Sequence, residues 1–208
     1  MTESTGTRER VLDAALVSFG TTGYDGTSLD ALAAELGVRK QTILYHFGSK
    51  EALLEAVIDR SAAELSVALE EALAGAGEGW DRVEAVVRSV FRLALRRPEL
   101  LGLVREVSRL GPPAASRLTT ALDPLVQRAR EFLEAEMAAG RMRPTDARLL
   151  LMSAYSTVIG VATEVEVLRA VGVEPTLRSL VQRRAELLEF LRSALMVEPD
   201  QEPVASRR

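Results

Sequence analysis

Apolar residues recur along this chain at the three- and four-residue spacing that places them on one face of an α-helix. Two clear stripes are Val11, Leu12, Ala15, Leu16, Phe19 and Val83, Val86, Val87, Val90, Phe91. The spacing is that of an amphipathic helix, and no alternating β-branched run of four or more residues competes with it. Because glycine and proline residues separate the stripes, each stripe is a helix of its own. The pattern predicts an all-α fold.

Start and stop signals divide the chain into about nine helices, three short ones followed by six longer ones. Their predicted ranges are 7–22, 28–35, 39–46, 49–73, 80–97, 99–110, 114–139, 145–171 and 176–196. The change in helix size predicts an N-terminal domain over 7–50 and a larger helical domain over 51–197. The ends, 1–6 and 198–208, are expected to be flexible tails.

Composition excludes several kinds of chemistry. The chain has no cysteine and a single histidine, His46, which excludes disulfides, thiolate metal sites and a histidine-rich metal site. No nucleophile–base pair is visible, and the glycine-rich stretch 75–79 follows no strand, so it is a connector and not a phosphate loop. We therefore predict no metal, no cofactor and no catalytic residue, and conclude that the chain is not an enzyme.

Hydropathy gives no sign of a membrane partner. No stretch reaches the ~18 consecutive apolar residues that a membrane helix needs, and the first ten residues lack the apolar segment of a signal peptide. The net charge is −4, from 26 basic and 30 acidic residues, which excludes a wholly basic nucleic-acid coat protein. A soluble cytoplasmic protein is expected.

The segment 29–47 contains two short helices joined at Gly37, where glycine can adopt the positive φ of a helix-to-helix turn. Thr27 with Asp30 is predicted to cap the first of them, and Ser49 the helix that follows. The second short helix carries an outward face of Arg39, Lys40, Gln41, Thr42, Tyr45 and His46. These side chains suit base edges and phosphates, so the segment is predicted to be a DNA-binding helix-turn-helix.

Many positions of this segment resemble the N-terminal domain of the TetR family of transcriptional regulators. They are Thr7-Arg8, Val11-Leu12, Ala14-Ala15, Phe19, Gly23-Tyr24, Thr27-Ser28, Leu32-Ala33, Leu36-Gly37-Val38, Thr42, Tyr45-His46-Phe47 and Ser49-Lys50-Glu51-Ala52-Leu53. The resemblance covers residues 7–54, about a quarter of the chain, and is ungapped. The remaining helices resemble that family in number, length and order.

The resemblance implies a role for each matching residue. It places the hydroxyls of Ser28 and Thr42 on DNA phosphates, together with the side chains of Tyr45, His46 and Lys50. It places Lys40 and Gln41 where the family reads bases. Two positions depart from the pattern: Leu44 stands where the family usually has tyrosine, and Arg39 replaces a small polar residue. Leu44 loses a hydroxyl contact but can touch a thymine methyl group, and Arg39 adds a cation.

Bulk charge gives DNA binding no support, because residues 1–50 hold five basic and six acidic residues. Without the motif, the face that carries Lys40 and Gln41 is an ordinary solvated helix face. Phe47 is interpreted as a core residue and not as a DNA contact.

The resemblance also implies an effector pocket within the larger domain, formed by the predicted helices between 80 and 171. The candidate lining residues are Phe91, Leu95, Leu103, Val107, Met137, Met152 and Tyr155, and the alternative for each is ordinary core packing. Arg105, Arg109 and Glu164 are candidates for its polar groups. An apolar pocket with few polar groups suits a small lipophilic molecule.

The segment 149–162 is apolar nearly all round, so every side of it must be covered. A four-helix interface made from the last two helices of each of two copies covers it, and the resemblance implies the same C2 homodimer. The candidate interface residues are Val158, Leu180, Leu187, Leu188 and Leu191. The alternative is a bundle within one chain.

Together these features predict a ligand-responsive transcriptional regulator, most simply a repressor. It is expected to bind a palindromic operator in double-stranded DNA as a homodimer and to be released by a small lipophilic effector. The alternative is a helical protein-interaction adaptor without catalytic activity, which explains the larger domain but not the N-terminal motif.

Overall fold

A computed structural model describes residues 2–197, and within them every regular element is an α-helix apart from one β-bridge between Met142 and Met196. The all-α class is confirmed. Ten helices are present in this range, one more than predicted. The predicted tail 198–208 lies outside the described residues. No helix in the described range is both long and apolar enough to cross a membrane.

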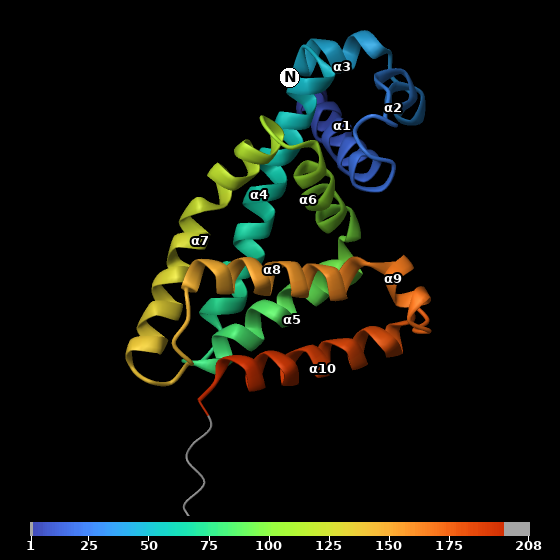
Figure 1. The fold of residues 1–208 in the computed structure, drawn as a ribbon. Helices are drawn as coiled ribbons and strands as arrows, with labels where there is room; N and C mark the ends of the chain where they lie inside the picture. Colours follow the sequence, from blue (N-terminus) through green and yellow to red (C-terminus); the bar gives the residue numbers. More distant parts are fainter. Residues whose placement is uncertain (1, 198–208) are drawn as a thin grey trace, which may run out of the picture. The chain divides into compact units, whose positions relative to one another are not determined.

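The first three helices are α1 (Thr2–Thr21), α2 (Leu29–Leu36) and α3 (Lys40–Phe47), as Figure 1 shows. Helices α2 and α3 agree with the predicted ranges to within one residue. Helix α1 begins five residues before the predicted start, so it includes residues 2–6. The flexible tail expected over 1–6 stays a prediction. Gly6 lies inside the helix because one glycine costs about 1 kcal/mol there without ending it.

The next four helices are α4 (Lys50–Ala74), α5 (Trp80–Arg96), α6 (Pro98–Leu110) and α7 (Ala114–Ala138). Pro98 begins α6 at a position where its missing N–H costs nothing. Pro124 lies inside α7.

The chain forms two compact units that do not follow the predicted boundary between residues 50 and 51. The first unit contains the residues up to Ala72 together with Ser89–Leu125, and the second contains Leu73–Arg88 together with the residues from Val126 onward. The difference has a physical cause, because α4, α6 and the start of α7 share one apolar core with the three N-terminal helices. The functional division into 7–50 and 51–197 stays a prediction.

The core of the first unit joins the helix-turn-helix to α4 and α6. Its fully buried members include Phe19 on α1, Ile43 on α3, Leu53 on α4 and Val107 on α6. Full burial of one such side chain contributes roughly 1.5–3 kcal/mol. Helices α1 and α6 run side by side (Figure 1), and their closest approach is at two glycines, Gly20 and Gly102, where an added Cβ would meet backbone.

The second unit contains α8 (Ala147–Thr163), α9 (Val165–Ala170) and α10 (Leu177–Leu195). The predicted single helix over 145–171 is wrong, because the backbone leaves the helical region at Glu164 (φ −80°, ψ 77°). Helix α10 begins at a reciprocal cap formed by Thr176 and Ser179. Helices α8 and α10 pack against each other.

Candidate nucleic-acid interface

Helix α2 begins at Ser28, whose Oγ accepts a hydrogen bond from the Ala31 N–H at 3.0 Å. The predicted cap by Thr27 is therefore wrong. Thr27 is buried, and its hydroxyl is used inside the fold, donating to the Gly23 carbonyl and sharing a hydrogen bond with the Ser18 hydroxyl. Ser28 is exposed, and its cap leaves the hydroxyl proton free to donate to a phosphate.

The turn between α2 and α3 is built as the sequence predicts. Gly37 has φ 67°, and the N–H groups of Gly37 and Val38 donate to carbonyls of the last turn of α2. Val38 and the fully buried Ile43 pack into the core, so the face of α3 that carries Ile43 points toward the core. The opposite face of α3 is left for solvent.

The structure places most of the predicted DNA-binding side chains at the surface. Arg39, Lys40, Gln41 and Tyr45 are exposed, and Tyr45 keeps 84% of its surface. Thr42, His46 and Lys50 are partly buried. The polar face of α3 is thus accessible along its whole length, which is what a recognition helix needs.

Leu44 differs from its neighbours on α3. It is partly buried and packs against the core, so less of it is available for the thymine contact considered above. Phe47 also packs against the core, in agreement with its interpretation as a core residue, and the Arg8 guanidinium lies 5.2 Å from its ring centroid.

Lys40 forms an ion pair that sequence reasoning missed. Its Nζ lies 2.8 Å from Oδ2 of Asp30 on α2, and both side chains are exposed. The pair joins the first turns of α2 and α3. Asp30 was predicted as a capping residue, and its actual partner is ten residues further along the chain.

Lys50 lies at the start of α4, as predicted. The preceding residue, Ser49, caps this helix: its side chain accepts a hydrogen bond from the Ala52 N–H at 3.1 Å. The Lys50 Nζ lies 4.1 Å from the centroid of the Tyr24 ring, and the Tyr24 hydroxyl donates to Glu51 at 3.0 Å. Burial and the Glu51 carboxylate raise the pKa of Tyr24 to about 12. Tyr24 matches the family pattern, but no DNA-binding role was predicted for it.

The predicted effector-pocket residues differ widely in exposure. Phe91, Leu103 and Val107 are buried, Met137 is partly buried, and Leu95, Met152 and Tyr155 are exposed. Arg109, a candidate for pocket polarity, instead forms ion pairs with Glu106 and Asp25. The three exposed residues do not belong to the core of the single chain, and the pocket assignment of all seven stays a prediction.

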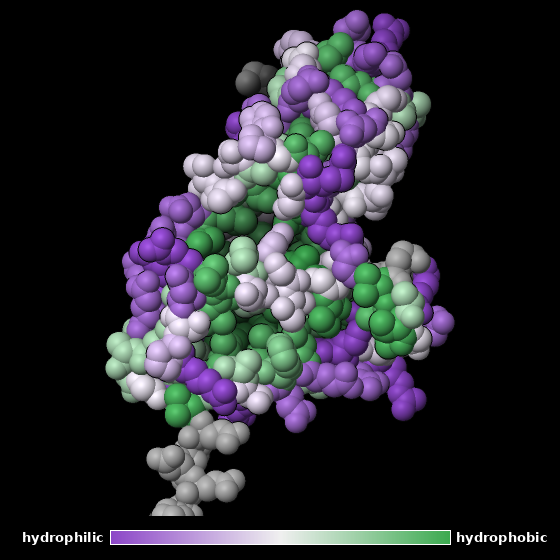
Figure 2. Space-filling model, viewed as in Figure 1, coloured by the Kyte–Doolittle hydropathy of each residue, from purple (hydrophilic) through white to green (hydrophobic). Residues whose placement is uncertain are grey.

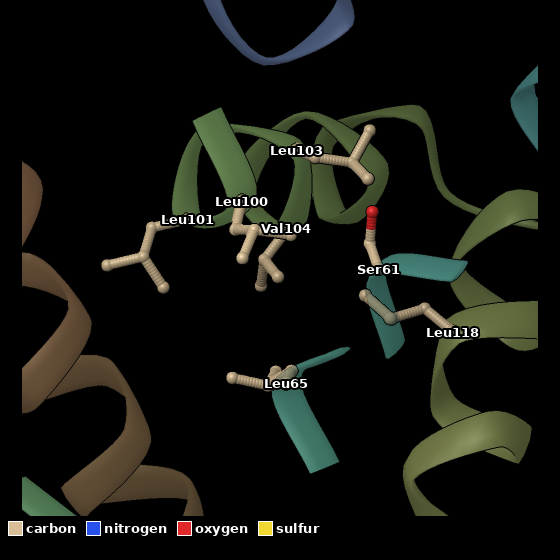
Figure 3. Close-up of a pocket in the computed structure, with 7 residues that line it drawn as sticks. All are labelled: Ser61, Leu65, Leu100, Leu101, Leu103, Val104 and Leu118. Atoms are coloured by element: carbon tan, nitrogen blue, oxygen red, sulfur yellow. The ribbon is translucent and has the colours of Figure 1, made fainter. Parts of the chain in front are cut away.

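A cavity of about 10 Å³ lies in the first unit between α4, α6 and α7 (Figure 3). It is lined by Ser61, Leu65, Leu100, Leu101, Leu103, Val104 and Leu118. This volume holds about one water molecule. Leu103 is the one predicted pocket residue among its walls. Ser61 is 4% exposed, and its hydroxyl, which points toward Leu103 in Figure 3, has no hydrogen-bond partner among the described residues.

Four of the five predicted interface residues pack inside the chain itself. Val158, Leu180, Leu187 and Leu191 are buried in the second unit, and Leu188 is partly buried. They lie in the unit where α8 packs against α10, and their assignment to an interface between two copies stays a prediction. The periodicity identified buried positions but could not say which helix covers them.

A different apolar face is exposed on α8. Leu149, Met152 and Tyr155 follow one another at three-residue spacing and are 59%, 60% and 47% exposed. Leu177 and Val181 are exposed near the start of α10. Figure 2 shows hydrophobic side chains at the surface around α8. Apolar residues gathered on one exposed helix face are candidates for an interaction surface.

Comparison with known proteins gives a family match for the N-terminal segment. Residues 11–57 match the family described as "Bacterial regulatory proteins, tetR family". The biofilm operon icaADBC HTH-type negative transcriptional regulator IcaR of Staphylococcus aureus (strain Newman) is 38% identical over 48 residues, 23% of this chain and 26% of IcaR. The tetracycline repressor protein class D of Escherichia coli is 37% identical over 91 residues, 43% of this chain and 40% of the repressor. The chain thus spans about a quarter of the length of the staphylococcal relatives that it matches.

The likeness of the fold extends much further than that of the sequence. A TetR transcriptional regulator from Chloroflexus aurantiacus J-10-fl superposes with a TM-score of 0.74 at 25% identity, covering 95% of this chain and 100% of that chain. An N-terminal helix-turn-helix followed by a larger helical region is therefore a known arrangement. These relatives are named as regulators and repressors, in agreement with the prediction that the chain is not an enzyme.

Proposed function

We propose that the chain is a DNA-binding transcriptional regulator of the TetR family and that it inserts α3 into the major groove. The match of residues 11–57 to that family and the likeness of the fold to a TetR regulator support this. The observation that carries the proposal is the exposed polar face of α3, held outward by the buried Ile43 on the opposite side. A helix of this width fits the major groove, where base edges are distinguishable.

The side chains of this face divide by chemistry. Gln41 carries an amide that pairs bidentately with adenine, and Arg39 and Lys40 carry cations that suit guanine. Groups that can donate to phosphates surround these base-reading residues. They belong to Thr42, Tyr45, His46, Lys50 and the capping residue Ser28. Phosphate contacts hold the register, and the α3 contacts supply the sequence preference.

The active species is proposed to be a homodimer formed through the exposed apolar face of α8 with the start of α10. Two α3 helices then enter successive major grooves about one helical turn apart, ~34–36 Å, and read a palindromic operator. A single α3 offers too few base contacts for a specific site, whereas two copies multiply both contacts and charge.

Repression with release by a small lipophilic effector is the simplest regulatory scheme. Support comes from the repressors among the relatives. Suppose that the effector fits only a form of the protein in which the two α3 helices have a different spacing. The effector then weakens DNA binding, and DNA weakens effector binding by the same factor. Such a coupling free energy is usually ~1–3 kcal/mol.

The test of DNA binding is selection of genomic fragments by the purified protein, followed by gel shifts on the fragment upstream of its own gene. We expect a retained fragment with an inverted repeat and weaker binding to a scrambled version of it. Equal binding to both DNAs at every salt concentration would contradict sequence-specific recognition. A thermal-shift screen of lipophilic compounds tests the effector, because a ligand of the folded state raises the melting temperature.

A further inference from the structure

Lys50 is a cation at a place that disfavours cations. It is the first residue of α4, where the unpaired backbone N–H groups and the helix dipole present partial positive charge. Its ammonium lies 4.1 Å from the centre of the Tyr24 ring. The negative face of an aromatic ring attracts an ammonium by about 0.5–2 kcal/mol. The ring therefore offsets the unfavourable field and fixes where the charge lies.

Tyr24 is itself held in place through its side chain. Its hydroxyl donates to Glu51 Oε1 at 3.0 Å, and its ring packs against Phe19 with centroids 5.6 Å apart. The phenol is protonated at neutral pH, far below its pKa of about 12, so the hydroxyl is a donor there. The ring has little freedom to turn away from Lys50.

The backbone of Tyr24 is held from α6. Its N–H donates to Glu106 Oε1 at 2.7 Å, and Arg109 binds both oxygens of the same carboxylate at 2.8 Å. The Arg109 side chain also reaches Asp25 at 3.1 Å. Gly23 has φ 86°, and a Cβ there would lie 3.2 Å from Glu106 Oε1, so glycine permits the close approach. The loop between α1 and α2 is thereby fastened to α6.

We propose that Tyr24 is a positioning residue that holds the Lys50 ammonium for its contact with a DNA phosphate, and that Glu106 on α6 holds Tyr24. This rests on the proposed DNA-binding function, within which it assigns two residues outside the helix-turn-helix face. Glu106 lies 56 positions from Lys50 in the sequence, and Tyr24 is the link between them.

The first experiment is a salt titration of operator binding, followed by fluorescence anisotropy. Lys50→Ala is expected to reduce the salt slope, per protomer, by ~0.9 for each phosphate that the variant no longer binds. Tyr24→Leu, which removes the ring face, is expected to reduce it equally, and the double variant no further. Tyr24→Phe keeps the ring but loses the hydrogen bond to Glu51, and it is expected to reduce the slope less than Tyr24→Leu does. An unchanged slope in Tyr24→Leu, or additive reductions in the double variant, would overturn the proposal.

The second experiment uses the intact protein, so it does not depend on whether Tyr24→Leu folds. The chain has two lysines, Lys40 and Lys50, so one Lys→Ala variant assigns the ε-methylene proton resonances of both. A lysine above a ring face has these resonances shifted upfield, and we expect the shift for Lys50 and not for Lys40. Its absence in the wild-type protein overturns the Tyr24–Lys50 contact.

Glu106→Ala tests the link to α6. It removes the acceptor of the Tyr24 N–H together with the ion pair with Arg109, and it is expected to reduce the upfield shift of Lys50 and the salt slope together. Arg117→Gln is the matched control, because it breaks an arginine–carboxylate pair with Asp59 that has no bond to Tyr24 or Glu106. Equal effects of the two variants would show general destabilisation and would overturn the role of Glu106.

The outcomes separate this proposal from the proposed function. If Lys50→Ala leaves the salt slope unchanged while the protein still binds its operator, the phosphate contact and the positioning role both fail and the regulator remains. If no operator is bound under any condition, the proposed function fails first.

Discussion

The ammonium of Lys40, a proposed base-reading residue, is bound to the carboxylate of Asp30 at 2.8 Å. Both side chains are exposed, so the pair is worth only about 0–1 kcal/mol and opens at low cost. In the free protein it neutralises a cation of the proposed recognition face. In the proposed complex, DNA phosphates would repel the same carboxylate.

Asp30→Asn is therefore expected to strengthen DNA binding a few-fold and to steepen its salt dependence, because Lys40 no longer has an internal partner. The measurement is anisotropy on operator and scrambled DNA. Glu35→Gln, an exposed acidic residue at the other end of α2, is the control for general charge. If both variants strengthen DNA binding equally, the gain comes from the loss of a negative charge in general, and the ion pair of Asp30 with Lys40 does not reduce DNA binding.

Much of the fold could be predicted because local signals and tertiary packing agree in the N-terminal helices. Gly37 adopts the expected left-handed conformation, and Phe19 and Ile43 are buried as their spacing indicates. The break at Glu164 could not be predicted, since apolar periodicity continues through it without glycine or proline. The helix propensities of the residues around Glu164 do not indicate that the helix ends there.

The site residues likewise have some features that the sequence predicts and others that it does not. Exposure along α3 follows from the polar pattern, whereas the partners of Lys40 and Lys50 depend on which helices meet. Glu106 carries no local signal, since it lies on an ordinary amphipathic helix and acts on a loop 82 residues away. Likewise, Leu187 and Met152 are both apolar helical positions, and only the packing of α8 on α10 decides that one is buried and the other exposed.

Gln41→Ala and Lys50→Ala are expected to differ in kind. The loss of a base-reading amide should cost ~1–3 kcal/mol per base pair read, at particular operator positions, with a nearly unchanged salt slope. The loss of a phosphate-binding cation should weaken specific and random DNA alike. Salt titrations of both variants on operator and scrambled DNA measure this. A uniform loss of affinity in Gln41→Ala with a changed slope would show that this residue does not read bases.

Met152→Glu and Val181→Glu are expected to convert a dimer into monomers, because a charge buried in an apolar interface without a partner is costly. Both side chains are more than half exposed in the single chain, so folding should be unaffected. Sedimentation velocity and operator binding give the readouts. Val67→Glu on α4, with similar exposure, is the control. A dimer that survives both substitutions would remove α8 and α10 from the interface.

Gly102→Ala is expected to destabilise the first unit by about 1–3 kcal/mol, since its Cβ would clash with the Gly20 carbonyl oxygen where α1 packs against α6. Gly160→Ala on α8 is the matched control, because the added Cβ meets no atom within 4 Å beyond the neighbouring backbone of its own helix. There the better helix propensity of alanine should raise stability by up to about 1 kcal/mol. Denaturant unfolding at one fixed protein concentration compares the two. A neutral Gly102→Ala would mean that the helices separate easily.

Glu136 on α7 is buried and pairs with Arg141, which donates to both carboxylate oxygens at 2.7 and 2.8 Å. These hydrogen bonds hold the pKa of Glu136 below its ordinary value of 4.5. The unfolded chain therefore binds the proton more tightly than the folded one. The stabilisation is fully present above the ordinary value and is lost as the pH falls toward the lowered pKa.

Glu136→Gln is accordingly expected to cost about 1–3 kcal/mol at neutral pH, the usual worth of a hydrogen bond to a charged group. The difference from wild type should shrink as the pH falls below 4.5, because protonation removes the same charge from the native protein. Denaturant unfolding at a series of pH values measures both effects. Glu131→Gln, an exposed residue on the same helix, should show neither. A difference between wild type and Glu136→Gln that stays constant from neutral to acid pH would mean that the Glu136 charge contributes nothing to folding, and that the loss arises from packing alone.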